Sequence, residues 1–285
     1  MNQDIINLFD EYTHKPLTRQ DFLSKLAKLT GSMSSALLVL PLLEVNYANA
    51  AVISENDEDI LTEDVTYNSD NVTMKAYAAR PKMNGKYGSV VVIHENRGLN
   101  PHIKDVARRV AKAGFIAIAP DALSEFGGTP ANEDEAREMI GKLDESRNLN
   151  HFLDALKYAA ERKESNGKVG CVGFCWGGAM ANQLAINAPA LKAAVAYYGR
   201  QPVNEDVSKI KSRVQLHYGG LDERLNAGIP AYEAALKKAG IQYELYIYEG
   251  AQHAFNNDTA PTRYNEAAAK LAWERTLKLL NEILK

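Results

Sequence analysis

Residues 168–180 read KVGCVGFCWGGAM, which is typical of an apolar strand that passes through a glycine-rich turn into a helix. The turn, GFCWG at 173–177, matches the G-x-S-x-G nucleophile elbow with sulfur in place of the hydroxyl oxygen. Glycines flank an elbow because side chains there would collide with the strand and the helix. The N-terminus of the following helix favours a thiolate. Cys175 is therefore the candidate nucleophile, and the alternative is a buried structural cysteine.

An elbow of this kind requires an acid and then a histidine later in the chain. The sequence SRVQLHYGGL at 212–221 is typical of a strand and turn, and Asp222 follows it. A second strand pattern, YELYIYE at 243–249, leads through a short turn to His253. Catalytic residues gather in loops at the carboxyl ends of parallel strands. Asp222 and His253 are therefore the candidate acid and base; the alternatives are a solvated turn aspartate and a capping or core histidine.

These ordered motifs resemble the dienelactone hydrolase family of α/β-hydrolases, from roughly Asp64 to the C-terminus. The matching segments are VVVIHENRGLN (90–100), FIAIAPD (115–121), GFCWGG (173–178), VAYYG (195–199), the Asp222 turn and GAQHAF (250–255). The resemblance implies a carboxylic ester or lactone hydrolase with a triad of Cys175, His253 and Asp222. It also implies that Glu95 contacts the thiol and helps to control its ionisation; a solvated loop glutamate is the alternative.

Hydrolysis through a tetrahedral intermediate needs two backbone donors for the oxyanion. One is expected from Trp176, the residue after the nucleophile, and the other from the loop after the third strand. The resemblance places the second donor at Asn96.

The resemblance weakens at the substrate. Family members that act on anionic lactones are expected to carry arginines after the PD segment at 120–121 and after the catalytic histidine, and this chain has none there. Three other arginines on expected strand-end loops are candidates to bind a substrate carboxylate, or else ordinary surface residues: Arg97, Arg200 and Arg263. The reaction type is therefore predicted more firmly than the substrate.

Composition excludes several classes of function. The chain has 285 residues, 46% of them hydrophobic and 24% charged, with a formal net charge of −3. A chain of this length can bury a full core, and the charge gives no support for nucleic-acid binding. Its two cysteines, Cys171 and Cys175, lack the C-x-x-C redox spacing, and no histidine and cysteine cluster has zinc spacing. We expect a small-molecule ester or lactone as partner, and neither a metal nor another cofactor.

Hydrophobic periodicity predicts an α/β protein in which strands alternate with helices. The pattern implies a parallel α/β sheet, and the family resemblance implies the α/β-hydrolase fold, with a mostly parallel central sheet and helices on both faces. The expected strands cover 64–67, 72–79, 89–94, 115–119, 168–173, 193–198, 213–218 and 243–249. The expected helices cover 101–113, 132–143, 148–163, 177–188, 229–239 and 263–284.

Residues 1–54 form a separate N-terminal extension before the catalytic domain at 55–285. LTRQDFLSK at 17–25 resembles a twin-arginine export motif with glutamine in the second arginine position, and ALLVLPLL at 36–43 is too short to span a bilayer. ANA at 48–50 has the form of a signal cleavage site. We interpret the extension as a degenerate export signal or a helical arm packed on the body or on a second copy in a homo-oligomer. A cytoplasmic location is expected, with the periplasm as the alternative.

Two other functions stay open from the sequence. One is an α/β-hydrolase relative that binds ligands without catalysis, and the other is a thiol redox protein that uses Cys175. The complete set of candidate site residues argues against the first. The absence of a suitably placed resolving cysteine argues against the second.

Overall fold

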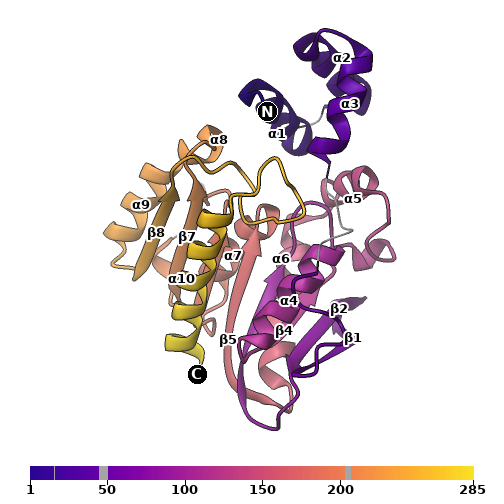
Figure 1. Cartoon of the computed structure of the whole chain (residues 1–285). Helices are drawn as coiled ribbons and strands as arrows, with labels where there is room; N and C mark the ends of the chain where they lie inside the picture. Colours follow the sequence, from indigo (N-terminus) through magenta and orange to yellow (C-terminus); the bar gives the residue numbers. More distant parts are fainter. Residues whose placement is uncertain (16, 45–50, 203–206) are drawn as a thin grey trace.

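A computed structural model describes residues 1–15, 17–44, 51–202 and 207–285 (Figure 1). The strands are β1 (Ile60–Ser69), β2 (Val72–Pro81), β3 (Tyr87–Ile93), β4 (Ile116–Pro120), β5 (Ser165–Phe174), β6 (Ala193–Tyr197), β7 (Arg213–Gly219) and β8 (Tyr243–Tyr248). They form one sheet with the order β1-β2-β4-β3-β5-β6-β7-β8. Strand β2 is antiparallel to both β1 and β4, and the other neighbours are parallel. This mostly parallel sheet is the one predicted for the α/β-hydrolase fold.

Helices cover both faces of the sheet. They are α4 (Pro101–Lys112), α5 (Glu133–Ile140), α6 (Glu145–Glu161), α7 (Trp176–Asn187), α8 (Glu223–Asn226), α9 (Ile229–Lys238) and α10 (Glu266–Leu284). Helices α4 and α10 lie in front of the sheet in Figure 1, while α6 and α7 contact each other on the other side. Because both faces are covered, β4 and β6 are buried along their whole length. The parallel strands therefore read as continuous apolar runs in the sequence.

Each predicted strand is present, and the differences lie at the ends and between motifs. Strand β1 extends well beyond the expected 64–67. It is an edge strand that pairs with β2 alone, and many of its side chains are exposed. The ends of β1 are polar and therefore lack the apolar alternation that predicts a strand. The short helix α8 was not predicted. Asp222 is its N-cap, and the Asp222 carboxylate accepts a hydrogen bond from the Leu225 N–H at 3.3 Å.

The first described residues form three short helices: α1 (Gln3–His14), α2 (Arg19–Thr30) and α3 (Met33–Leu43). Each helix has an N-cap residue whose side chain accepts a hydrogen bond from a backbone N–H of the first turn. These residues are Asn2, Thr18 and Ser32. The three helices enclose a cluster of their own, in which Tyr12 stacks on Phe22 with ring centroids 4.4 Å apart. We call α1–α3 the N-terminal arm. In Figure 1 it lies beyond the carboxyl ends of the parallel strands.

In the described ranges, no single helix is both long and apolar enough to cross a bilayer; α2 and α3 would pass that test together but meet at a bend of 109°. The sequence at 48–50 that resembles a cleavage site lies outside the described residues.

Candidate active site

Cys175 occupies a strained turn between β5 and α7. Its backbone has φ 55° and ψ −111°, a conformation that residues other than glycine rarely adopt. A Cβ atom on Gly173 would lie 1.9 Å from the Gly177 carbonyl oxygen, and one on Gly177 would lie 2.4 Å from that of Ile93. Both flanking positions therefore require glycine. The geometry is that of a nucleophile elbow, with the thiol at the end of a central strand.

The surroundings of the elbow match the needs of an oxyanion site. Trp176 is the first residue of α7, so its N–H is among the helix donors without an intrahelical partner. Its indole stacks on the His94 ring with centroids 5.2 Å apart. Asn96, in the loop after β3, lines the same cavity as Cys175 and Trp176. The two residues expected to donate to an oxyanion therefore line the cavity that contains the nucleophile.

His253 and Asp222 form a buried pair next to this turn. The His253 Nδ1 atom lies 2.6 Å from Asp222 Oδ2, and each residue is 5% exposed. Burial acts to raise the pKa of Asp222, but the hydrogen bond and the charge of His253 outweigh it and hold the pKa below its usual value. The His253 Nε2 atom is buried without a hydrogen-bond partner among the described residues. This pair presents a bare ring nitrogen toward the thiol.

Glu95 is buried beside the site, but its hydrogen bonds go elsewhere than expected. One carboxylate oxygen accepts from the Tyr198 hydroxyl at 3.3 Å and the other from the Asn257 amide at 2.9 Å. In the part of the chain that the structure describes, the thiol of Cys175 instead makes its side-chain hydrogen bond with His14. Tyr198, which lines the cavity, therefore links Glu95 to the cavity wall through a hydrogen bond.

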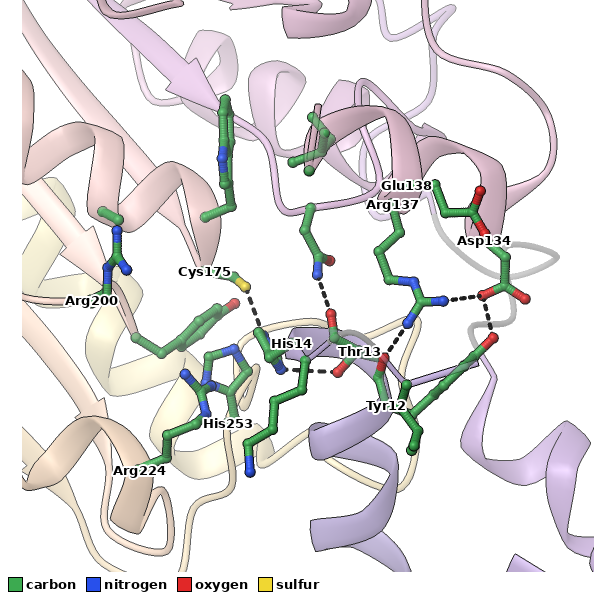
Figure 2. A pocket seen from close by; sticks show the side chains of 18 of the residues that line it. Tyr12, Thr13, His14, Asp134, Arg137, Glu138, Cys175, Arg200, Arg224 and His253 are labelled. Atoms are coloured by element: carbon green, nitrogen blue, oxygen red, sulfur yellow. Dashed lines mark hydrogen bonds and ion pairs between the residues drawn. The ribbon is translucent and has the colours of Figure 1, made fainter. Parts of the chain in front are cut away.

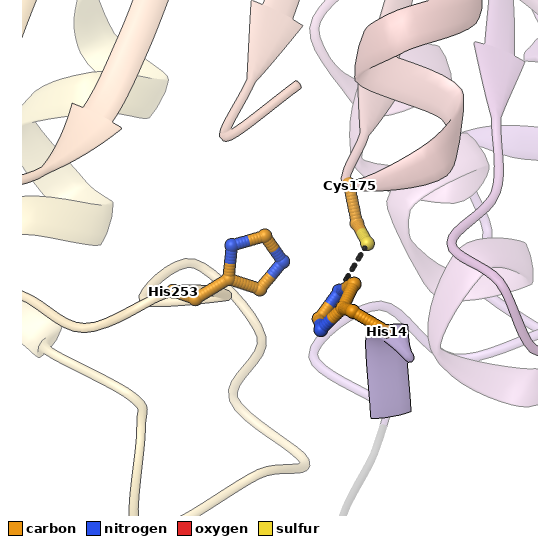
Figure 3. Close-up of side chains that lie close together, drawn as sticks. All are labelled: His14, Cys175 and His253. Carbon is orange, nitrogen blue, oxygen red and sulfur yellow. Dashed lines mark hydrogen bonds between the residues drawn. The ribbon is translucent and has the colours of Figure 1, made fainter. Parts of the chain in front are cut away.

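His14 is a site residue that the sequence analysis missed. It is the last residue of α1, and its Nε2 atom lies 3.2 Å from the Cys175 sulfur (Figure 3). Its ring meets that of His253 edge-on, with centroids 4.5 Å apart. Burial and the charge of His253 act to lower the pKa of His14, but the charge of Cys175 and hydrogen bonds with Asp10 and Cys175 raise it above its usual value. Two imidazoles from distant parts of the chain therefore face one sulfur.

Polar contacts dock the end of α1 onto α5 and the loop after β3 (Figure 2). The Tyr12 hydroxyl donates to Asp134 at 2.7 Å, and Arg137 donates to the Tyr12 carbonyl oxygen. The Asn96 amide donates to the carbonyl oxygen of Thr13 at 2.7 Å. These contacts fix the end of α1, and with it His14, over the elbow.

The cavity between the arm and the elbow has a volume of about 1050 Å³. Of the three arginines predicted for a substrate carboxylate, Arg200 lines this cavity. Arg97 instead forms an ion pair with Glu133, and Arg263 lies 5.2 Å from the ring centroid of Phe9. Arg200 is therefore the one of the three that the structure brings to the cavity wall.

Nothing in local sequence spacing could identify His14, because 161 residues separate it from Cys175. A usable signal was the apolar face of α1, where Ile5, Phe9 and Tyr12 recur at helical spacing and are buried. That face indicates a helix that packs against other parts of the chain.

Comparison with known proteins places these features in a family context. The profile of the dienelactone hydrolase family matches residues 74–284. A Saccharolobus solfataricus protein named "Putative carboxymethylenebutenolidase" is 35% identical over 262 residues, covering 79% of this chain and all of the relative. A Methylorubrum extorquens protein of the same name is 30% identical and covers 92% of this chain and 94% of the relative. The crystal structure of a "Putative Dienelactone Hydrolase" from Klebsiella pneumoniae superposes with a TM-score of 0.70 at 30% identity, covering 78% of this chain and 98% of that one.

Proposed function

The chain belongs to the dienelactone hydrolase family and is a hydrolase of the carboxylic ester and lactone type, and from this premise we propose that it acts through Cys175 as a covalent nucleophile. Support comes from the strained elbow that holds the thiol at the cavity and from the buried His253–Asp222 pair beside it. The proposed substrates are small esters or lactones that fit the cavity between the arm and the elbow.

In the first step, the Cys175 thiol gives its proton to His253 Nε2, and the resulting thiolate sulfur attacks the carbonyl carbon. A carbon–sulfur bond forms, and the carbonyl oxygen takes the negative charge. Collapse of this intermediate breaks the bond to the leaving oxygen, which takes a proton from the His253 imidazolium. Water then gives a proton to His253 Nε2 and attacks the thioester carbonyl. The carbon–sulfur bond breaks, and the carboxylic acid leaves.

The oxyanion formed in each step is assigned to the backbone N–H groups of Trp176 and Asn96. A preorganised donor of this kind typically stabilises the transition state by about 3 kcal/mol. The positive end of α7 acts in the same direction, because Cys175 immediately precedes its first residue.

Two histidines face the sulfur, and we assign proton transfer to His253. Asp222 orients its ring and compensates the imidazolium charge that develops during the reaction. His14 holds the hydrogen bond to the thiol, so a carbonyl group that approaches the sulfur must share space with the His14 ring. The end of α1 is therefore a boundary of the proposed acyl site.

The single observation that carries the proposal is the position of Cys175: a positive-φ residue at a cavity, next to a carboxylate-bound imidazole with a bare Nε2. A binding protein without catalysis has no need for a strained thiol at that position. A thiol redox protein would use a second cysteine, and Cys171 is fully buried inside β5.

Hydrolysis of p-nitrophenyl acetate by wild type, Cys175→Ala and the matched control Cys171→Ala tests the proposal. We expect Cys175→Ala to lose at least about a thousandfold in kcat/KM, while Cys171→Ala stays within a fewfold of wild type. Wild-type turnover by Cys175→Ala would contradict the proposal. Peroxide consumption without ester turnover would support the redox alternative, and ester binding without turnover would support the binding protein.

A further inference from the structure

We propose that His14, Cys175 and His253 together form a binding site for one zinc-class divalent ion, which joins the N-terminal arm to the catalytic domain. One ligand atom from each of the three side chains lies within 4.8 Å of the other two (Figure 3). Two imidazole nitrogens and one thiolate are a donor set that zinc accepts in tetrahedral sites. The fourth position would face the cavity, which all three residues line.

The distances between the three ligand atoms are close to those around a bound tetrahedral zinc ion. Ligands about 2.0–2.3 Å from a tetrahedral zinc ion lie roughly 3.5 Å from one another. The His14 Nε2 and Cys175 Sγ atoms are already 3.2 Å apart. The widest separation in the group would have to shorten by about 1 Å, a movement that rotation of a histidine side chain can supply.

Both histidines are held in the orientation that a metal ligand requires. The Nδ1 atom of His253 is bound to the Asp222 carboxylate at 2.6 Å. The Nδ1 atom of His14 lies 2.8 Å from the Asp10 carbonyl oxygen and 3.1 Å from its carboxylate. Metal-ligating histidines usually donate their second ring N–H to such groups, which fixes the tautomer that leaves Nε2 as the ligand. Here the same arrangement occurs twice around one sulfur.

The local charge also suits a cation. His253 Nε2 is buried without a hydrogen-bond partner among the described residues, so its lone pair is available. The thiolate and the two carboxylates of Asp10 and Asp222 supply negative charge close to the proposed ion. Arg224, which lies 3.2 Å from Asp10 Oδ2, offsets part of that charge. A buried divalent ion would therefore be compensated rather than isolated.

Binding needs no oxidant or reductant. A sulfur–metal bond forms, the thiol proton leaves to solvent, and the two Nε2 lone pairs complete the protein ligands. The ion would occupy the sulfur that the proposed hydrolysis needs, so metal binding and turnover would exclude each other. This effect on turnover rests on the proposed function, whereas the binding site itself does not.

Cobalt(II) is the probe for the test, because a cobalt–thiolate bond gives a charge-transfer absorption band in the near ultraviolet. We expect full-length, chelator-treated wild type to bind one Co²⁺ with this band, and Zn²⁺ to displace it. His14→Ala should raise the Kd for Zn²⁺, measured calorimetrically, on the order of a hundredfold. Lys15→Ala, a change to an exposed side chain next in the chain, is the matched control and should stay within about twofold.

Two further variants cover the case in which loss of His14 displaces the arm. His14→Cys keeps a ligand at this position and should retain Co²⁺ binding with a stronger charge-transfer band. Cys175→Ser should lose the band. The proposal is overturned if wild type shows no thiolate band, or if both His14→Ala and His14→Cys bind Zn²⁺ like wild type. Ester turnover by the metal-free enzyme without any Co²⁺ site would reject this inference alone; a Co²⁺ site without turnover would reject the proposed function alone.

Discussion

The edge of the sheet and the N-terminal arm each place a histidine beside the same sulfur, but by different physical means. His253 stands in a loop directly after a strand, and its Asp222 partner follows the neighbouring strand β7. His14 stands at the end of a helix that is positioned by contacts with side chains far away in the chain, such as Asn96 and Asp134. Backbone topology thus builds one half of the site, and tertiary docking builds the other.

If the sheet edge supplies the catalytic base, loss of His253 should have the largest effect. We expect His253→Ala to lower kcat for p-nitrophenyl acetate on the order of ten-thousandfold or more, because the Cys175 thiol and the attacking water both lose the base that takes their proton. His14→Ala, compared in the same assay, should lower kcat far less. If kcat fell more in His14→Ala than in His253→Ala, the general base would be His14 of the N-terminal arm.

The two cysteines provide a second contrast, between the elbow and the strand that leads to it. Burial raises the pKa of Cys171 to about 12, so near pH 8 roughly one such thiol in ten thousand is ionised. Iodoacetamide should therefore label Cys175 at least about a thousandfold faster than Cys171. Labelling of Cys171 should rise roughly tenfold for each pH unit until the pH reaches that pKa. Peptide mass spectrometry with fragmentation locates the label, and equal rates would contradict the assignment.

The close packing around Gly173 predicts that an alanine at this position destabilises the protein. Gly173→Ala places a Cβ atom 1.9 Å from a backbone oxygen that cannot move away without distorting α7. We expect the free energy of unfolding to fall by about 3 kcal/mol, measured by urea denaturation. Gly141→Ala is the matched control, because the nearest atom to its Cβ would lie at 3.5 Å and its φ is −66°. Similar stabilities for the two variants would mean that the elbow is not held by this packing.

The smallest expected effect concerns substrate charge. Because Arg97 is paired with Glu133 and Arg263 packs on Phe9, Arg200 is the candidate that remains at the cavity. We predict that a neutral lactone ester is turned over at least as well as its carboxylate analogue, as judged by kcat/KM for the matched pair. A strong preference for the anion that disappears in Arg200→Ala would contradict this prediction. A charge-assisted contact of that kind is worth about 2 kcal/mol, or roughly thirtyfold.

The sheet and its motifs could be predicted because their signals are local. Buried parallel strands form apolar runs, and the elbow needs glycine at fixed positions around its nucleophile. In the α/β-hydrolase fold the acid and then the histidine follow the nucleophile in the sequence, which identified Asp222 and His253 as candidates. The contact between His14 and Cys175 could not be predicted in this way, since it depends on how the arm packs against α5 and the loop after β3. The hydrogen bond from Asn257 to Glu95 could not be predicted for the same reason, because 162 residues separate the two.

Mass spectrometry of acid-quenched enzyme during turnover of p-nitrophenyl acetate tests the central claim most directly. The account predicts an acetyl group on the sulfur of Cys175 in wild type, and none in Cys175→Ala under the same conditions. Because Cys171 and Cys175 are close enough in sequence to fall in one peptide, fragmentation must place the group on one of them. Turnover with no acyl group on Cys175, or with the group on Cys171 or another side chain, would contradict the account.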